Sequence, residues 1–240
     1  MHMHFKELYL LPGIIPSGPA IINNFNKFFN RIGLRYNLVR VPDGMANMHT
    51  VEQRINIYHL VSRVLQFKVQ GEFTEFGCFN GQSAMVIQKV LQSTVSNASV
   101  WLYDNFKSKY DKDLDVKSTL LQNFVRFQLN QPRIIEGDFL KTVPTELPQR
   151  IAFAHIDCGF GGNPDLHMDI VLHLLKNIYP RLSPGAVVLF MDYHDPNHTI
   201  KGDAINPGVK MACDVFFHDK PEAVYTLFGN QYSHGYIIKD

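Results

Sequence analysis

FTEFGCFNGQS, residues 73–83, is the stretch of the chain that decides the fold. An apolar segment rich in β-forming residues runs through Glu75, and glycines follow it at positions 77 and 81. A helical segment is expected to begin at Ser83, directly after the second glycine. Because glycine has no Cβ, the backbone at Gly77 and Gly81 can approach a ligand closely and adopt left-handed angles. A strand, a tight glycine turn and a helix N-terminus predict a cradle for a nucleotide-like ligand; the plainer alternative is an ordinary strand-to-helix turn.

Strands and helices alternate along the chain from Gly71 onward. The expected strands cover residues 73–78, 99–103, 133–136, 151–156 and 186–190, and the expected helices cover residues 83–92, 116–129, 165–179 and 206–217. Two further strands, 223–228 and 235–239, follow the last helix and are joined by a short turn. Such alternation is typical of a doubly wound α/β fold. The sequence therefore predicts a seven-stranded, mostly parallel sheet that ends in an antiparallel hairpin.

The N-terminal part of the chain differs from this alternating region. Prolines and glycines interrupt residues 1–47, whereas residues 50–67 have the spacing of a helix that Thr50 and Gln53 would cap. Apolar residues lie on more than one side of this helix, so we expect it to pack between the main domain and either a second subunit or the N-terminal arm. Residues 1–70 are thus predicted to be an arm and helix that form a lid or oligomer contact, within the same domain as the ligand-binding residues 71–240. A homo-oligomer would explain the broad apolar surface, and a covered helix in a monomer would explain it equally well.

Acidic residues lie at the ends of four of the expected strands. These residues are Glu75, Asp104, Asp157 and Asp192. The carboxyl ends of parallel strands meet at one edge of a doubly wound sheet, and ligands bind there. The pattern predicts a shared site, although turns favour aspartate for reasons of their own.

Each of these positions suggests a role. An acid at the second strand tip, Asp104, would accept hydrogen bonds from ribose hydroxyls. Asp138 follows the third strand and either borders the base of a nucleotide or simply caps a helix. His155 is expected to be a satisfied core histidine or one that supports a site residue.

The segment after the fifth strand, MDYHDPNH at residues 191–198, is dense in potential metal ligands and bases. We select Asp192 and His194 from it as site residues. Asp195 and His198 are interpreted as solvated loop residues. Carboxylates would suit magnesium, and added imidazoles would shift the preference toward transition metals.

The composition excludes several classes of protein. The chain has 240 residues, 45% of them hydrophobic, and a formal net charge of +1. A packed core is therefore expected, and no basic surface for nucleic acid is indicated. Three cysteines without a C-x-x-C spacing favour a reducing cytoplasm. No signal peptide or membrane span is predicted.

The motif E-x-G-x-x-x-G at residues 75–81 resembles the first motif of class I S-adenosylmethionine (SAM) methyltransferases. Further segments in consistent order resemble the macrocin O-methyltransferase family, the TylF-like enzymes: GEFTEFG at 71–77, VWLYDNF at 100–106, ID at 156–157, YPRLSPG at 179–185 and MDY at 191–193. The resemblance implies a Rossmann-like class I methyltransferase fold and methylation of a hydroxyl on a small molecule, such as a sugar or natural product, without nucleic acid or membrane partners. It implies that SAM is bound by Glu75, Gly77, Gly81, Ser83, Asp104 and Asp138. A base or a metal must remove the proton of the hydroxyl, and we take Asp157, Asp192 and His194 from the residues themselves as the catalytic candidates.

The chain departs from the family pattern at two positions. Met191 replaces the first of two aspartates after the fifth strand, and Gly159 replaces the second acid after the fourth. Asp157 and Asp192 then remain as the candidate ligands of the magnesium ion that relatives use. These two carboxylates could hold Mg²⁺ weakly, His194 could join them, or the site has lost its metal. We favour weak or absent magnesium.

Two other functions stay open. A NAD-type oxidoreductase would share the sheet, but the chain lacks G-x-G-x-x-G at this position. A SAM-binding protein without catalysis is the second alternative, because acids of the family pattern are missing. The residues do not distinguish O- from N- or C-methylation, and they do not identify the methyl acceptor.

Overall fold

One mixed sheet organises the chain, as the sequence predicts. The computed structural model describes residues 24, 27, 28, 31–33, 49–107, 114–159, 162–198, 206–229 and 232–240. The strands are β1 (Glu72–Phe76), β2 (Val100–Asp104), β3 (Arg133–Glu136), β4 (Ile151–Ile156), β5 (Leu182–Phe190), β6 (Tyr225–Gly229) and β7 (Tyr232–Ile238). Their order in the sheet is β3-β2-β1-β4-β5-β7-β6. Strands β1 to β5 pair in parallel, and β7 lies antiparallel between β5 and β6.

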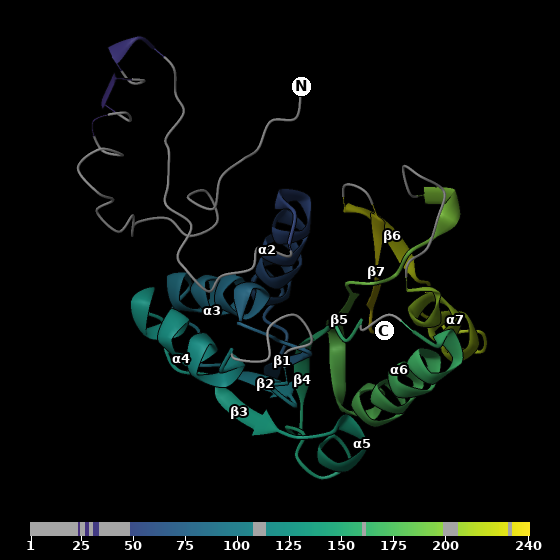
Figure 1. Cartoon of the computed structure of the whole chain (residues 1–240). Helices are drawn as coiled ribbons and strands as arrows, with labels where there is room; N and C mark the ends of the chain where they lie inside the picture. The colour runs from purple at the N-terminus through teal and green to yellow at the C-terminus, as the bar shows by residue number, and fades with distance from the viewer. Residues whose placement is uncertain are drawn as a thin grey trace.

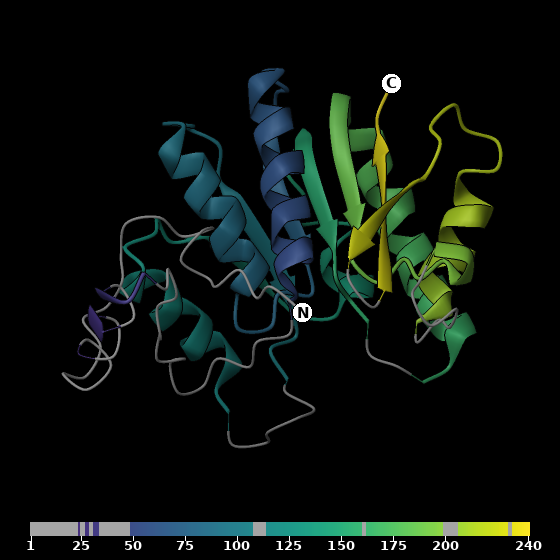
Figure 2. The ribbon, with the colours of Figure 1, turned by 90° about the horizontal axis from the view of Figure 1, so that it is seen from above.

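Helices cover both faces of the sheet (Figures 1 and 2). They are α2 (Val51–Gln66), α3 (Gln82–Ser93), α4 (Val116–Arg126), α5 (Phe139–Thr142), α6 (Pro164–Ile178) and α7 (Pro207–Phe216). Side chains of α2, α3 and α4 form one apolar core with one face of the sheet, and side chains of α5, α6 and α7 form a second core with the other face. No helix in the described ranges is long and apolar enough to span a membrane.

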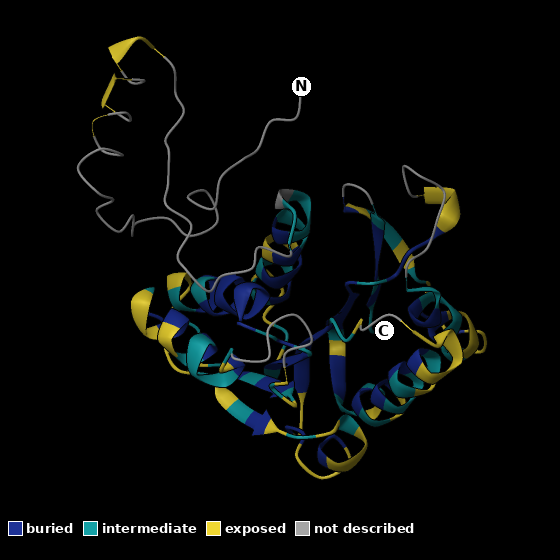
Figure 3. Cartoon of the chain, in the orientation of Figure 1, coloured by how far each residue is buried: buried dark blue, intermediate teal, exposed yellow. Residues whose placement is uncertain are grey.

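The central strands are apolar on both sides because helices cover both of their faces. All six residues of β4 are buried, and so are the last five of β5. Figure 3 shows these strands in dark blue at the centre of the molecule. Successive side chains point to opposite faces, so Phe73 packs toward α2 and α3 whereas Phe76 packs toward the second core. The same alternation fixes which side chains at the strand ends can meet.

Helix α2 begins with the predicted capping box. Thr50 Oγ1 accepts a hydrogen bond from the backbone N–H of Gln53, and the Gln53 side chain accepts one from the backbone N–H of Thr50. The helix packs against α3 and against β4, β5 and β6. Thr50 Oγ1 donates to the carbonyl of Gly229 (3.2 Å), and Asn56 Nδ2 donates to that of Phe228 (3.0 Å). These two hydrogen bonds connect the N-terminal end of α2 to the hairpin formed by β6 and β7.

Replacing Thr50 with alanine is expected to lower the free energy of unfolding by about 1 kcal/mol, because the first turn of α2 loses its side-chain cap. Urea unfolding followed by circular dichroism measures the change. Thr145→Ala is the matched control, since Thr145 is exposed and caps no long helix. Equal stabilities of the two variants would contradict the role of the capping box.

Some boundaries differ from the sequence prediction. Strand β5 begins at Leu182 rather than at residue 186, because Pro184 and Gly185 are accommodated inside it. Gly185 has φ +80° and its N–H bonds to the carbonyl of Lys239 (2.7 Å), so the strand continues through the glycine. Helix α5 was not predicted, since four residues carry no periodic signal. Residues 230 and 231 of the hairpin turn, and most of residues 1–48, lie outside the described residues, so the lid or oligomer role of the arm stays a prediction.

Candidate active site

The predicted glycine turn joins β1 to α3. Gly77 has φ +84° and Gly81 has φ +85°, both in the left-handed region. A Cβ built on Gly77 would lie 2.1 Å from the carbonyl oxygen of Asp157, so only glycine lets the end of β1 approach the end of β4 this closely. Gly81 is the N-cap residue of α3. The turn therefore lies between two neighbouring strand ends and a helix N-terminus.

A cavity of about 330 Å³ opens at the carboxyl ends of these strands. Its lining includes Gly77, Asp104, Asp138 and Asp157, so it brings together residues from four of the predicted positions. The predicted site residues that do not line it are Glu75, Gly81, Ser83, Asp192 and His194.

Asp104 stabilises the glycine turn by hydrogen bonds. Its Oδ2 accepts hydrogen bonds from the backbone N–H groups of Cys78 and Phe79, each at 2.9 Å, and its Oδ1 accepts one from Phe106 at 2.8 Å. A carboxylate offers about four acceptor positions, and these three hydrogen bonds leave about one unused. Asp104 can thus shape the turn and still accept a hydrogen bond from a ligand.

Asp138 caps a helix and also lies at the cavity, and its contact with the base of a nucleotide stays a prediction. Its Oδ1 accepts a hydrogen bond from the backbone N–H of Leu140 (2.9 Å) and caps α5. The residue also lines the cavity. The capping interpretation is confirmed, and the second carboxylate oxygen remains available to a ligand.

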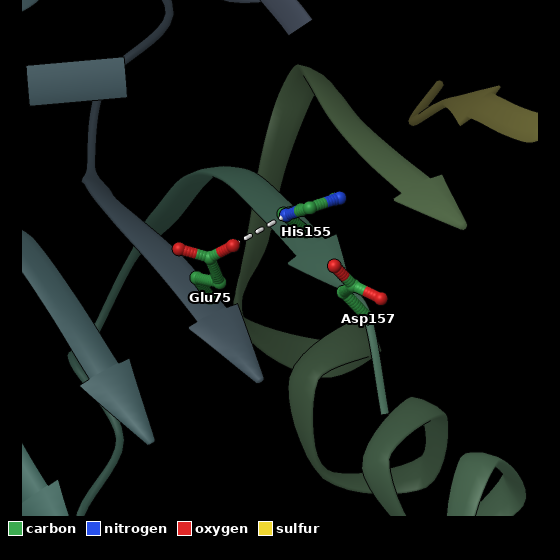
Figure 4. A group of neighbouring side chains, drawn as sticks. All are labelled: Glu75, His155 and Asp157. Atoms are coloured by element: carbon green, nitrogen blue, oxygen red, sulfur yellow. Dashed lines mark hydrogen bonds and ion pairs between the residues drawn. The ribbon is translucent and has the colours of Figure 1, made fainter. Parts of the chain in front are cut away.

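Glu75 lies fully buried behind the turn. Its Oε1 accepts hydrogen bonds from Ser83 Oγ and, at 2.8 Å, from Nδ1 of His155. Figure 4 shows the Glu75 carboxylate and the His155 ring facing each other across β1 and β4. His155 is itself fully buried, as expected of a core histidine, but only its Nδ1 has a hydrogen-bond partner among the described residues. The predicted contact of Glu75 and Ser83 with the cofactor stays a prediction, and in this structure the two side chains bond to each other.

Asp157 lies at the inner edge of the cavity. Its Oδ2 contacts His49 Nε2 at 3.2 Å, and both residues line the cavity. Burial alone would raise the pKa of the Asp157 carboxyl, but the hydrogen bond from His49 and the charges of His49 and His155 hold that pKa below its usual value. Sequence reasoning missed His49, which precedes the capping residue of α2 and meets Asp157 only through the fold.

Asp192 lies beside Asp157, outside the cavity lining. Its Oδ1 accepts a hydrogen bond from Asn206 Nδ2 (2.9 Å), and burial together with the negative charge of Asp157 raises its pKa to about 7. A Cβ at Gly159 would lie 1.9 Å from Asp192 Oδ2. The glycine is therefore a requirement of this arrangement, since any larger residue at position 159 would displace the Asp192 carboxylate.

The loop after β5 holds its two histidines differently. His194 is buried, stacks on Tyr232 with ring centroids 4.4 Å apart, and places Nε2 3.9 Å from Asp192 Oδ1. His198 is exposed, as predicted. Asp195 is not: it is buried, its backbone N–H bonds to Ser233, and its carboxylate bonds to His198. The solvated interpretation of Asp195 is therefore wrong, because β7 packs against the loop.

The family model described as macrocin-O-methyltransferase (TylF) matches residues 34–202. This chain belongs to the TylF family. It is 28% identical over 165 residues to mycinamicin III 3''-O-methyltransferase of Micromonospora griseorubida, covering 59% of this chain and 62% of the relative. It is 28% identical over 174 residues to a tetracenomycin rhamnosyl 4'-O-methyltransferase of Streptomyces olivaceus, covering 63% and 64%. The chain thus matches less than two thirds of the length of these TylF relatives.

Solved structures agree on the fold of this TylF family chain. The O-methyltransferase NovP superposes with a TM-score of 0.65 at 21% identity, covering 82% of this chain and 84% of that one. The SAH-bound methyltransferase PaMTH1 of Podospora anserina superposes with a TM-score of 0.54 at 15% identity, covering 96% and 100%. The predicted methyltransferase-like sheet is confirmed.

Proposed function

We propose that this TylF family chain is a SAM-dependent O-methyltransferase that acts on a hydroxyl group of a small molecule, such as a sugar on a natural product. The observation that carries the proposal is the cavity that Gly77, Asp104, Asp138 and Asp157 share at the carboxyl ends of the sheet. Two relatives with this family pattern are named as O-methyltransferases of glycosylated natural products.

The residues around the cavity fit SAM. Gly77 lines the cavity at the turn after β1, and Asp104 has an acceptor position left for ribose hydroxyls. Asp138, which follows the neighbouring strand β3, would border the base of the adenosine. When bound, SAM supplies a methyl group on a positively charged sulfur. Support for this ligand comes from PaMTH1, whose structure contains the demethylated product SAH.

The chain's own residues would orient the acceptor and receive its proton. A hydroxyl is a weak nucleophile, so a base must accept its proton as the oxygen is methylated. Asp157 is the candidate that lines the cavity, and Asp192 and His194 lie beside it. Holding the acceptor oxygen close to the methyl group, in line with the bond between that carbon and the sulfur, would contribute the remainder of the rate enhancement.

The site offers few ligands for magnesium. Asp157 and Asp192 would hold the ion, and the bound ion would supply Lewis-acid stabilisation of the deprotonated hydroxyl. The mutual repulsion that raises the pKa of Asp192 is a repulsion that a cation would relieve. However, Met191 and Gly159 contribute no further oxygen ligands, and the space beside Gly159 is filled by Asp192 itself. We therefore keep weak or absent magnesium as our proposal.

Replacing Asp104 with alanine is expected to weaken SAH binding by at least about 10-fold, since a charged acceptor is lost and the glycine turn is released. Isothermal titration calorimetry with SAH measures the affinity. Asp219→Ala is the control, because Asp219 is exposed and remote from the cavity. Unchanged SAH affinity in Asp104→Ala would contradict the placement of the cofactor.

The same calorimetry separates the alternative functions. Tight SAH binding without NAD binding would favour the methyltransferase over an oxidoreductase. Tight SAH binding without turnover on a broad panel of hydroxylated and glycosylated acceptors would favour a non-catalytic SAM-binding protein.

A further inference from the structure

A group of buried polar side chains between α2 and the sheet extends well beyond the residues that the proposed methyl transfer uses. It consists of Glu75, His155 and Asp157 at the ends of β1 and β4, with His49 and His234 alongside; we name it the histidine–carboxylate cluster. Glu75, His155 and His234 are each 0% exposed. Several of its atoms have no hydrogen-bond partner among the described residues: Glu75 Oε2, His155 Nε2, His49 Nδ1, and both ring nitrogens of His234.

These unpartnered atoms are unusual for a protein interior. Buried polar groups nearly always have a partner, and leaving one without it costs roughly 1–3 kcal/mol. His234 is the extreme case, because a fully buried imidazole with two unsatisfied nitrogens adds nothing that a phenylalanine would not add at lower cost. The concentration of such atoms in one place indicates that a ligand completes the cluster.

The geometry of the cluster suits a metal ion. Glu75, His155 and Asp157 each offer a ligand atom, and these atoms all lie within 4.8 Å of one another. Ligands of one zinc ion at about 2.0–2.2 Å lie roughly 3.3–3.5 Å apart, so small side-chain movements would close the site. Figure 4 shows the Glu75 carboxylate facing Nδ1 of His155, with the Asp157 side chain next to the ring at the end of β4.

The orientation of His155 supports the same interpretation. Its Nδ1 is bonded to Glu75 Oε1 at 2.8 Å, which leaves Nε2 unpartnered. Metal-binding histidines are commonly held in this way, with a carboxylate on the ring nitrogen that does not bind the metal. His234 on β7 is fully buried with both ring nitrogens unpartnered among the described residues, so this neighbouring imidazole can supply a further donor atom.

We propose that His155 and Asp157 bind a divalent transition-metal ion of the zinc type, with Glu75 as the orienting partner of His155 and His234 as a further candidate donor. The mixed imidazole and carboxylate set distinguishes this site from the all-carboxylate pair Asp157 and Asp192. Imidazoles favour zinc, cobalt and related ions over magnesium, which prefers oxygen ligands. The ion can enter from the cavity, since Asp157 and His49 line it.

The proposal is tested with the full-length chain, stripped of metal by a chelator and dialysed. Zinc titration against a chromophoric competitor is expected to show one zinc per chain with a Kd below about 1 µM, and Mg²⁺ at millimolar concentration is expected not to displace it. Cobalt substitution is expected to give visible absorption of a nitrogen- and oxygen-ligated site. Failure of the wild-type chain to bind zinc stoichiometrically would overturn the proposal.

Variants locate the bound ion. His155→Gln and His234→Gln are each expected to weaken zinc binding by at least about 10-fold, whereas the exposed His198→Gln is expected to leave it unchanged. If His155→Gln does not fold, as judged by circular dichroism, the test rests on the zinc affinity of His234→Gln compared with that of the wild type. Wild-type zinc affinity in every folded cluster variant would place the ion elsewhere and refute the site. SAH calorimetry on the same samples keeps this result separate from the proposed function, because SAH binding can hold or fail independently of zinc.

Discussion

Asp157→Ala is expected to reduce methyl transfer by at least about 100-fold while SAH affinity changes by less than about threefold. The carboxylate lines the cavity, contacts His49 and lies beside Asp192, so its loss removes the candidate base or the group that orients the acceptor. General-base catalysis is typically worth about 10²–10⁴-fold in rate. SAH should still bind, because the glycine turn and Asp104 are untouched.

Transfer of a labelled methyl group from SAM to a panel of glycosylated natural products measures this effect. Asp165→Ala is the matched control, since Asp165 is an exposed aspartate at the start of α6. Asp192→Ala should be assayed in parallel. Turnover at the wild-type rate in both Asp157→Ala and Asp192→Ala would remove the two carboxylates from the mechanism.

Gly77→Ala is expected to have the largest effect on the fold. The new Cβ would lie 2.1 Å from the carbonyl oxygen of Asp157, on a backbone with φ +84°. Backbone atoms cannot move aside as a flexible side chain can, so β1 and β4 would have to separate at the site. We expect a loss of about 3 kcal/mol or more in unfolding free energy, and loss of detectable SAH binding.

The control is a glycine with a similarly strained backbone but with open space around its Cβ position. It measures the cost of backbone strain without the steric clash. Gly162 has φ +93°, and a Cβ added there would meet nothing within 4 Å. Gly162→Ala should therefore cost only about 1–2 kcal/mol and leave SAH binding intact. Urea unfolding and SAH calorimetry on both variants make the comparison. Similar losses in the two variants would show that strain, not the approach of β4, explains the need for glycine at position 77.

The sheet could be predicted because each strand carries a local signal. Apolar runs bounded by glycine or acidic residues located every strand, although β5 and β7 begin earlier than expected. The capping box at Thr50 was equally local. Helix α5 was missed because its four residues are too few to show a period.

The candidate site could be predicted only in part, because its residues meet through the fold. Asp104, Asp138 and Asp157 share the cavity as parallel strand ends should. His49 and Asp157 are 108 positions apart, and Glu75 and His155 are 80 apart, so no local pattern pairs them. His234 lies on β7, which runs antiparallel to its neighbours. The expectation that site residues gather at the carboxyl ends of parallel strands therefore does not extend to His234. The direction of the Glu75 side chain, toward His155, depends on the register of β1 and β4.

The two hydrogen bonds from α2 to the closing hairpin have a consequence for biosynthesis. They join residues 179 and 172 positions apart, so α2 emerges from the ribosome long before its partner strand exists. The glycine turn, the parallel strands and α3, against which α2 also packs, can assemble in the meantime, but the two hydrogen bonds to the hairpin need residues 228 and 229. His49 is adjacent to the cap of α2, so a nascent chain would form the glycine turn before the hairpin can fix the position of His49 beside Asp157.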